Sequence, residues 1–322
     1  MSESRGYGSP AAFRQALTAK LRAKAQEGPW TLAQLQRQMA YDRLLERLYL
    51  TGEGWIVKGA AALLAREVGV RATVDIDVYR EAARELAEAE VRAAAARDIG
   101  DWFSFEIGAA RLIADGGAAT RMPVTAYIGT TVWASFHVDL VGPDVRMTGE
   151  PEPVPPLARV AMPDIHQHGY RAYPLVDHIA DKVVAMFELH GARRLPSTRY
   201  RDLVDLVAIV IGASVDAEAQ LTALAAQAER RQIALPVRFD VPDRALWEPG
   251  YAAEAGRSLL PVAHTLDDAL AVVAPFLDPL LDGARPAGGT RLGCSGRHDR
   301  RVRRLTERIP RTPDKPTRYA QW

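Results

Sequence analysis

The chain has 322 residues, of which 48% are hydrophobic and 25% are charged, and its formal net charge is +1. This composition is typical of soluble globular proteins, and the length allows one large domain or two smaller ones. No apolar run approaches the roughly 20 residues of a membrane helix, the N-terminus has no apolar signal segment, and a single cysteine excludes an intramolecular disulfide. We therefore expect a cytoplasmic protein that does not bind membranes.

Two helices are predicted at the start of the chain, over residues 9–27 and 31–50. A Gly-Pro pair separates them, and Thr31 is a suitable N-cap for the second. Apolar residues recur at helical spacing along one face of the second helix. Residues 1–54 are therefore predicted to form an N-terminal helical segment.

A strand, a glycine turn, a helix and a second strand are predicted next. The apolar residues 55–57 indicate a buried strand, and an alanine- and leucine-rich helix follows the turn at Gly59. The second strand carries Asp75 and Asp77, whose side chains point to the same side because they are two residues apart. We expect the apolar neighbours to face the other way, namely Val74, Ile76 and Val78.

The paired carboxylates and the glycine turn suit metal-assisted phosphate chemistry. Two converging carboxylates repel one another unless a cation lies between them, and Mg²⁺ binds carboxylates together with substrate phosphates. The turn at Gly59 leaves backbone N–H groups that can receive those phosphates. This order of elements indicates a nucleotidyltransferase. The alternative is a solvated strand edge, because Asp-x-Asp alone is a common pattern.

Residues 55–172 are expected to form an α/β core. Its further elements are a charged helix and three strands, predicted over residues 80–97, 102–107, 122–129 and 131–141. Asp139 lies in the apolar last strand, where an unpaired buried carboxylate is costly, so it needs a partner or a metal. We expect this strand to pair antiparallel with the Asp75/Asp77 strand and to complete a three-carboxylate cluster. The alternative is that Asp139 simply ends a strand.

The chain is predicted to become mostly helical after a proline-rich, irregular connection over residues 142–172. The predicted helices cover residues 174–190, 198–212, 216–231 and 265–281. Residues 173–284 are therefore expected to form a helical C-terminal domain.

Two of these helices carry charged residues that suit nucleotide binding. Lys182 lies beside a buried apolar stripe, so its amine could reach a triphosphate between the domains; the alternative is an ordinary surface lysine. In the next helix, Asp202 and Asp205 share one face. Arg199 precedes the first by three residues, and Arg201 precedes the second by four. The alternative here is intrahelical ion pairs on a solvated face.

The last segment, from Arg285 to Trp322, is strongly basic, with eleven Lys and Arg against three Asp and Glu. It is rich in Gly, Pro, Ser and Thr and has few periodic apolar residues, so it is predicted to be disordered. A basic tail of this kind can hold nucleic acid through its phosphates. The alternative is a passive extension.

Taken in order, these elements resemble the AbiEii/AbiGii nucleotidyltransferase toxins, which include the MenT toxins of mycobacteria and belong to the DNA polymerase β-like superfamily. The resemblance covers roughly residues 12–282. Its four motifs match Gly59-Ala60 with Asp75 and Asp77, then Asp139, then Ala180-Asp181-Lys182, then the segment from Arg199 to Asp205. Two residues depart from the family pattern. Ala60 stands where the family has the second small residue of the turn. Arg201 stands where the family has a lysine, so a planar guanidinium takes the place of a point charge.

The resemblance implies an α/β (α+β) fold, in which a nucleotidyltransferase-type mixed sheet flanked by helices precedes a mainly helical C-terminal domain. It implies a toxin of a toxin–antitoxin system that uses Mg²⁺ to transfer NMP from an NTP to an acceptor hydroxyl, with release of pyrophosphate. The implied partners are an RNA acceptor, the tRNA 3′ end, and an antitoxin encoded nearby. The alternatives are transfer to a protein or small-molecule hydroxyl, and a non-catalytic nucleotide- or RNA-binding protein.

The same resemblance assigns roles to individual residues. The expected Mg²⁺ ligands are Asp75, Asp77 and Asp139. The expected catalytic residues are these three carboxylates, Lys182 and Asp202. The residues expected to bind the nucleotide are Lys58, Gly59, Ala60, Arg71, Lys182, Arg199, Arg201 and Asp205.

Overall fold

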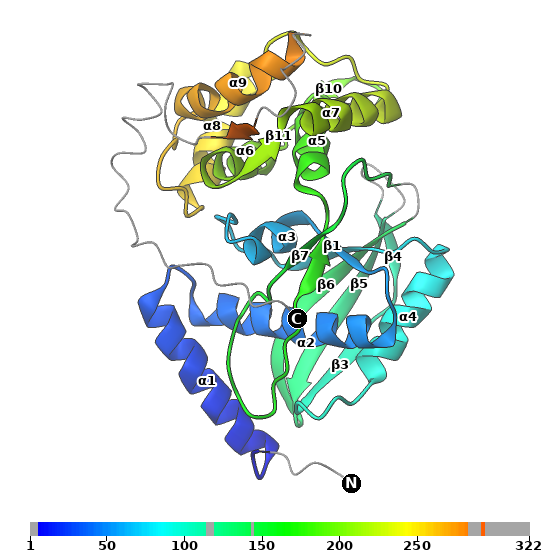
Figure 1. Ribbon diagram of the computed structural model, residues 1–322. Coiled ribbons are helices and arrows are strands. Elements are labelled where there is room, and N and C mark those ends of the chain that lie inside the picture. The colour runs from blue at the N-terminus through cyan, green and yellow to red at the C-terminus, as the bar shows by residue number, and fades with distance from the viewer. Residues whose placement is uncertain (1–5, 114–118, 143–144, 283–290, 294–322) are drawn as a thin grey trace.

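The computed structural model describes residues 6–113, 119–142, 145–282 and 291–293. A twisted sheet with helices against it forms the N-terminal part, and a group of helices follows beyond one end of the strands (Figure 1). This arrangement confirms the predicted α/β fold class. In the described part of the chain, none of the helices combines the length and the apolar character needed to span a membrane.

The sheet is mixed. Among the described residues its eight strands, in spatial order, are β3 (Phe103–Ile107), β5 (Ala119–Ile128), β6 (Thr131–Val141), β2 (Asp75–Tyr79), β1 (Ile56–Lys58), β8 (Tyr170–Ala172) and β7 (Glu152–Val154), with β4 (Arg111–Ile113) paired to β5. The pairs β2–β6 and β1–β8 are parallel, and the other pairs are antiparallel. The predicted hairpin between β5 and β6 is present.

Strand β6, which carries Asp139, runs parallel to β2 and not antiparallel as predicted. Helix α4 (Arg84–Ala96) returns the chain across the sheet between β2 and β3, so these two strands run in the same direction. Two successive antiparallel pairings, β3–β5 and β5–β6, then bring β6 back to that direction. Asp139 is still the direct neighbour of Asp77 in the register.

The side chains of β2 alternate as predicted, except at its start. Ile76 and Val78 are fully buried in the core of the sheet, so Asp75 and Asp77 face the opposite side. Val74 precedes the first residue of β2 and is 52% exposed, so it does not join the buried face.

Two N-terminal helices, α1 (Pro10–Glu27) and α2 (Leu32–Thr51), pack against the sheet (Figure 1). Thr31 caps α2 as predicted, because its hydroxyl accepts the Gln34 backbone N–H while the Gln34 side chain accepts the Thr31 N–H. The second half of α2 is buried all round, not on one face alone. Its Arg47 donates a two-pronged pair of hydrogen bonds to Asp101, which compensates the buried charge.

The C-terminal helices form a second hydrophobic core, separate from the core of the sheet. They are α5 (Leu175–Met186), α6 (Tyr200–Gly212), α7 (Ala217–Arg231), α8 (Arg244–Gly256) and α9 (Leu266–Leu281). Helix α8 was not predicted, because Pro249 and Gly250 in its interior disfavour a helix. Leu63 of α3 (Gly59–Ala65) belongs to the second core, so the helix after β1 ties the sheet to the C-terminal helices.

Three short strand pairs were also missed by the sequence analysis. Within residues 142–172, predicted to be irregular, β7 and β8 extend the sheet beyond β1. Two further pairs are β9 (Leu189–His190) with β10 (Leu195–Pro196), and β11 (Ser214–Asp216) with β12 (Arg291–Gly293). Strand β12 lies inside the segment predicted to be disordered; the rest of that basic tail lies outside the described residues. The domain boundaries themselves stay a prediction.

Candidate active site

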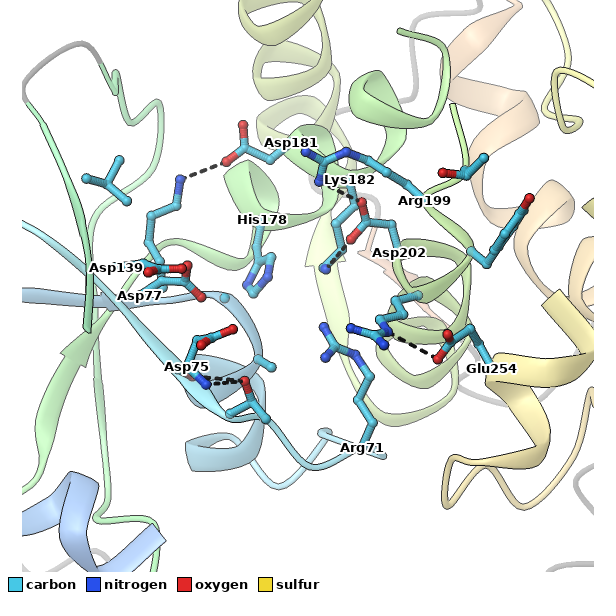
Figure 2. A pocket seen from close by; sticks show the side chains of 18 of the residues that line it. Arg71, Asp75, Asp77, Asp139, His178, Asp181, Lys182, Arg199, Asp202 and Glu254 are labelled. Atoms are coloured by element: carbon cyan, nitrogen blue, oxygen red, sulfur yellow. Dashed lines mark hydrogen bonds and ion pairs between the residues drawn. The ribbon is translucent and has the colours of Figure 1, made fainter. Parts of the chain in front are cut away.

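A pocket of about 700 Å³ lies between the sheet and the C-terminal helices (Figure 2). Of the predicted catalytic and nucleotide-binding residues, all but Asp205 line it, and the Asp205 side chain is buried. Carboxylates of β2 and β6 form one wall, and charged side chains of α5 and α6 form the wall opposite. The fold therefore gathers at one pocket segments that are far apart in the sequence.

The sheet wall holds three carboxylates side by side. The parallel register makes Asp77 the neighbour of Asp139, and Asp75 the neighbour of His137. The Asp139 side chain is buried, whereas Asp75 and Asp77 are half-buried. Each of these side chains faces the pocket, across from the helical part (Figure 2).

Gly59 brings the turn between β1 and α3 against one of these carboxylates. Its backbone φ is +61°, which glycine adopts far more readily than other residues. A Cβ atom at Gly59 would lie only 1.8 Å from Oδ2 of Asp77. The close approach of turn and carboxylate therefore requires glycine at this position.

Arg121 of β5 neutralises two of the three carboxylates. Its Nε donates to Oδ1 of Asp139 over 2.8 Å, and its Nη2 donates to Oδ2 over 2.7 Å. The same Nη2 lies 3.3 Å from Oδ2 of Asp75, whose Oδ1 is 2.9 Å from Nδ1 of His137. Sequence reasoning missed Arg121, although the β5–β6 register places it directly opposite Asp139.

The Asp77 side chain makes none of the hydrogen bonds or ion pairs found within the described residues, which sets it apart from its two neighbours. Burial in the pocket wall and the nearby charges of Asp139 and Asp75 raise the pKa of Asp77 from 3.8 to about 6. Lys58 and Lys182 oppose this increase in the pKa without cancelling it. A carboxylate in this state lacks a cation at its oxygens.

The opposite wall is built around Lys182, which is buried and is no surface lysine. Its Nζ donates to Oδ1 of Asp202 over 2.8 Å and to Oδ2 of Asp205 over 2.7 Å. Arg71 donates to both oxygens of Asp205 over 2.9 and 2.8 Å. The two aspartates of α6 therefore share a buried face, and the alternative of a solvated ion-pair face is wrong.

The remaining predicted cations also pair with acids. Arg199 donates to Asp202 over 3.3 Å, as its spacing of three residues suggests. Arg201 does not meet Asp205 and instead donates to Glu254 of α8 over 3.1 Å. On the sheet side, Lys58 donates across the pocket to Asp181 of α5 over 2.9 Å.

His178 is a further pocket residue that the sequence analysis missed. It lies one turn before Lys182 on α5 and is buried, with no hydrogen-bond partner for its Nδ1 in the described part of the chain. Burial and the charges of Lys182 and Lys58 hold the pKa of His178 well below its ordinary value, so the imidazole is neutral. The i, i+4 spacing from Lys182 was the available signal.

The donor set suits a hard cation such as Mg²⁺, because it consists of carboxylate oxygens and includes the unpaired carboxylate of Asp77. As the described side chains lie, however, no group of three His, Cys, Asp or Glu residues is arranged to hold a metal ion. Arg121 occupies the oxygens of Asp139 that a metal would need. The residues therefore have the chemistry that such a cation needs, while the guanidinium of Arg121 lies at the oxygens of Asp139.

Known proteins resemble this chain in family and in fold. The fold is similar to that of the nucleotidyltransferase toxin MenT4 of Mycobacterium tuberculosis, with a TM-score of 0.55 at 16% sequence identity over 83% of this chain and 90% of that one. JHP933 of Helicobacter pylori matches with a TM-score of 0.36 at 16% identity over 77% of this chain and 84% of that one. A comparison with curated proteins finds no match. The family model described as nucleotidyl transferase AbiEii toxin, type IV TA system, matches residues 43–272, so the chain belongs to the AbiEii family of nucleotidyltransferase toxins.

Proposed function

We propose that the enzyme transfers NMP from an NTP to the 3′-terminal hydroxyl of an RNA, a tRNA in the first instance, in a Mg²⁺-dependent reaction. The observation that carries this proposal is the pocket itself, where three carboxylates of the sheet face cations of the C-terminal helices (Figure 2). A triphosphate needs both, because its charge is balanced partly by metal on carboxylates and partly by protein cations.

In this proposal, Asp75, Asp77 and Asp139 hold the metal. The unpaired, half-buried carboxylate of Asp77 supports it, since bringing a cation to that site would relieve its repulsion with Asp139. Bound Mg²⁺ would supply charge neutralisation for the attacking and leaving oxygens. Asp139 would also receive the proton of the acceptor hydroxyl as that oxygen bonds to the α-phosphorus and pyrophosphate leaves.

The nucleotide is proposed to lie between the two walls. Backbone N–H groups at Gly59 and Ala60 would face its phosphates from the sheet side, next to Lys58. Lys182 would approach the departing phosphates from the helical wall, held in place by Asp202 and Asp205. The remaining cations proposed to contact the nucleotide are Arg71, Arg199 and Arg201.

The proposed partners follow from the family. A type IV toxin–antitoxin family implies an antitoxin, which we expect to be encoded nearby. RNA as the acceptor is supported by the basic segment after Arg285, because its net positive charge suits phosphate contacts.

Incubation with each NTP labelled at the α-phosphate, with Mg²⁺ and total RNA, tests the proposal. We expect one NTP to label a tRNA-sized band that ribonuclease removes and protease does not. A matched reaction with Asp75→Asn should give no label. Label that follows the protein fraction, or no labelled product from any NTP, would contradict RNA as the acceptor.

A further inference from the structure

Arg121 lies where a cation of the active site would be expected. It reaches the carboxylates from β5, directly opposite Asp139 in the strand register. Its guanidinium binds both oxygens of Asp139 over 2.8 and 2.7 Å and lies 3.3 Å from Asp75. A planar fork on a carboxylate is the geometry of a strong ion pair. The carboxylate cluster therefore already has a positive charge supplied by the chain itself.

The other cations around the pocket are arranged differently. Lys58 comes from the sheet, yet it binds Asp181 on the helical wall. Lys182 binds acids of its own helical wall. Among the described lysines and arginines, Arg121 alone forms ion pairs with the sheet carboxylates, and it does so with two of the three, Asp139 and Asp75.

The position of Arg121 also allows it to leave. Its side chain is 40% exposed, so it can turn into solvent without emptying a buried site. By contrast, Lys182 is enclosed, with 8% of its side chain exposed. A guanidinium on both oxygens of Asp139 and a divalent cation on the same oxygens compete, because the two positive charges would lie in close contact and repel one another.

We propose that Arg121 is a positioning residue that acts as a resident counterion: it holds Asp139 and Asp75 in the nucleotide-free enzyme and is displaced when a divalent cation arrives with the NTP. The free metal then binds weakly by itself, because it must compete with the guanidinium. The triphosphate would favour the metal over the guanidinium, because its own oxygens would add to the ligands of the metal. This inference rests on the proposed function, since it takes the three carboxylates as metal ligands.

Mn²⁺ titration of the nucleotide-free full-length protein, followed by electron paramagnetic resonance of the free ion, tests the inference. We expect Arg121→Gln to bind Mn²⁺ roughly tenfold more tightly than wild type, and Arg121→Lys to be intermediate because it keeps the charge without the fork. The matched control is Arg111→Gln. Arg111 is exposed and lies opposite Arg121 in the backbone register of β4 and β5. The substitution Arg111→Gln therefore removes an equal charge nearby.

Equal Mn²⁺ affinity in wild type and Arg121→Gln, or an equal gain in Arg111→Gln, would overturn the inference. A wild-type measurement avoids dependence on the variants. The Nε–H of Arg121 should show slow hydrogen exchange by NMR in the free enzyme and faster exchange with Mg²⁺ and a non-hydrolysable NTP analogue. Unchanged exchange would also overturn it.

Label transfer by the wild type separates this inference from the proposed function. If transfer requires a divalent cation while Arg121→Gln binds Mn²⁺ no better than wild type, the counterion role fails and the proposed function stands. If transfer proceeds without any divalent cation, the proposed function fails, and the inference with it.

Discussion

The two walls of the pocket differ in how the charge of each residue is compensated. On the helical wall, Lys182 and Arg71 saturate the oxygens of Asp205. On the sheet wall, Asp77 has no partner within the described residues and carries a raised pKa. Substitutions on the two walls should therefore change stability in opposite directions.

Asp77→Asn should stabilise the metal-free protein at pH 7. The pKa of Asp77 is about 6 in the folded protein and 3.8 ordinarily, so its ionised form opposes folding. Replacement by a neutral amide should raise the free energy of unfolding by about 1 kcal/mol, a discounted value because the pocket is open to water. Denaturant unfolding with a chelator present measures this.

The pH dependence of the stability difference between Asp77→Asn and wild type checks the direction of this effect separately. As the pH falls through 6 towards 3.8, the folded protein binds the proton more tightly than the unfolded chain, so wild type gains stability from Asp77. The advantage of Asp77→Asn should therefore shrink to nothing by about pH 4. Asp42, whose pKa is also raised to about 6, contributes equally to both proteins and cancels in the difference. A destabilised Asp77→Asn at pH 7 would make Asp77 a structural residue.

Lys182→Ala should lower both stability and activity. It leaves Asp202 without its buried partner, and breaking a buried pair typically costs about 3 kcal/mol. Loss of one preorganised charge near the phosphates should also slow label transfer about a hundredfold, measured below the melting temperature of the variant. Lys20→Ala, at an exposed position of α1, is the control. Wild-type transfer rates in a destabilised Lys182→Ala protein would confine Lys182 to a structural role.

At the scale of elements, the turn between β1 and α3 lies against Asp77, one of the three sheet carboxylates. Gly59→Ala would place a Cβ 1.8 Å from Oδ2 of Asp77 and strain a backbone with φ of +61°. We expect loss of label transfer together with destabilisation of about 2 kcal/mol. Gly100→Ala is a matched control, since Gly100 also has a positive φ but has no atom within 4 Å of the added Cβ. If both variants behave alike, the contact with Asp77 has no consequence.

Local patterns predicted most elements but not how they meet. The strand over 102–107 and the Thr31 cap were predicted from neighbouring residues, and both are present in the structure. The direction of β6 relative to β2 depends on the crossover through α4, which no local pattern reports. Helix α8 was missed because its stability comes from burial of Trp247 and Tyr251, which outweighs the helix-disfavouring Pro249.

The same distinction explains the site. The sequence showed two carboxylates two residues apart, Asp75 and Asp77, and two aspartates three residues apart, Asp202 and Asp205. The first three line one pocket, and Asp205 accepts a hydrogen bond from Lys182, which also lines it. Arg121 was invisible because its ion pair with Asp139 depends on the β5–β6 register. The spacing of four residues from Arg201 to Asp205 permits an intrahelical pair, but Arg201 donates to Glu254 of another helix, which no spacing within α6 reveals.

At the scale of the whole molecule, the pocket lies between two hydrophobic cores. The carboxylates belong to elements of the first core and Lys182 to a helix of the second, and Leu63 of α3 joins the second core from the sheet side. The position of one wall relative to the other therefore depends on this contact and on the ion pair from Lys58 to Asp181.

The basic C-terminal segment is expected to act on RNA and not on the nucleotide. Truncation after Gly293 keeps the β11–β12 pair and removes most of the basic residues. RNA affinity should fall, and its dependence on salt should become flatter, because fewer phosphates are neutralised. NTP affinity should not change. Identical RNA affinity at low and high salt in the two proteins would make the segment a passive extension.

The most direct test of the account follows the two ends of the triphosphate. With the preferred NTP, Mg²⁺ and the labelled acceptor fraction, label at the α-phosphate should enter the acceptor, and label at the γ-phosphate should leave as pyrophosphate. Asp77→Asn, folded and at least as stable as wild type, should neither label the acceptor nor release labelled pyrophosphate. Transfer of the γ-phosphate, or undiminished transfer by Asp77→Asn, would contradict nucleotidyl transfer at the sheet carboxylates.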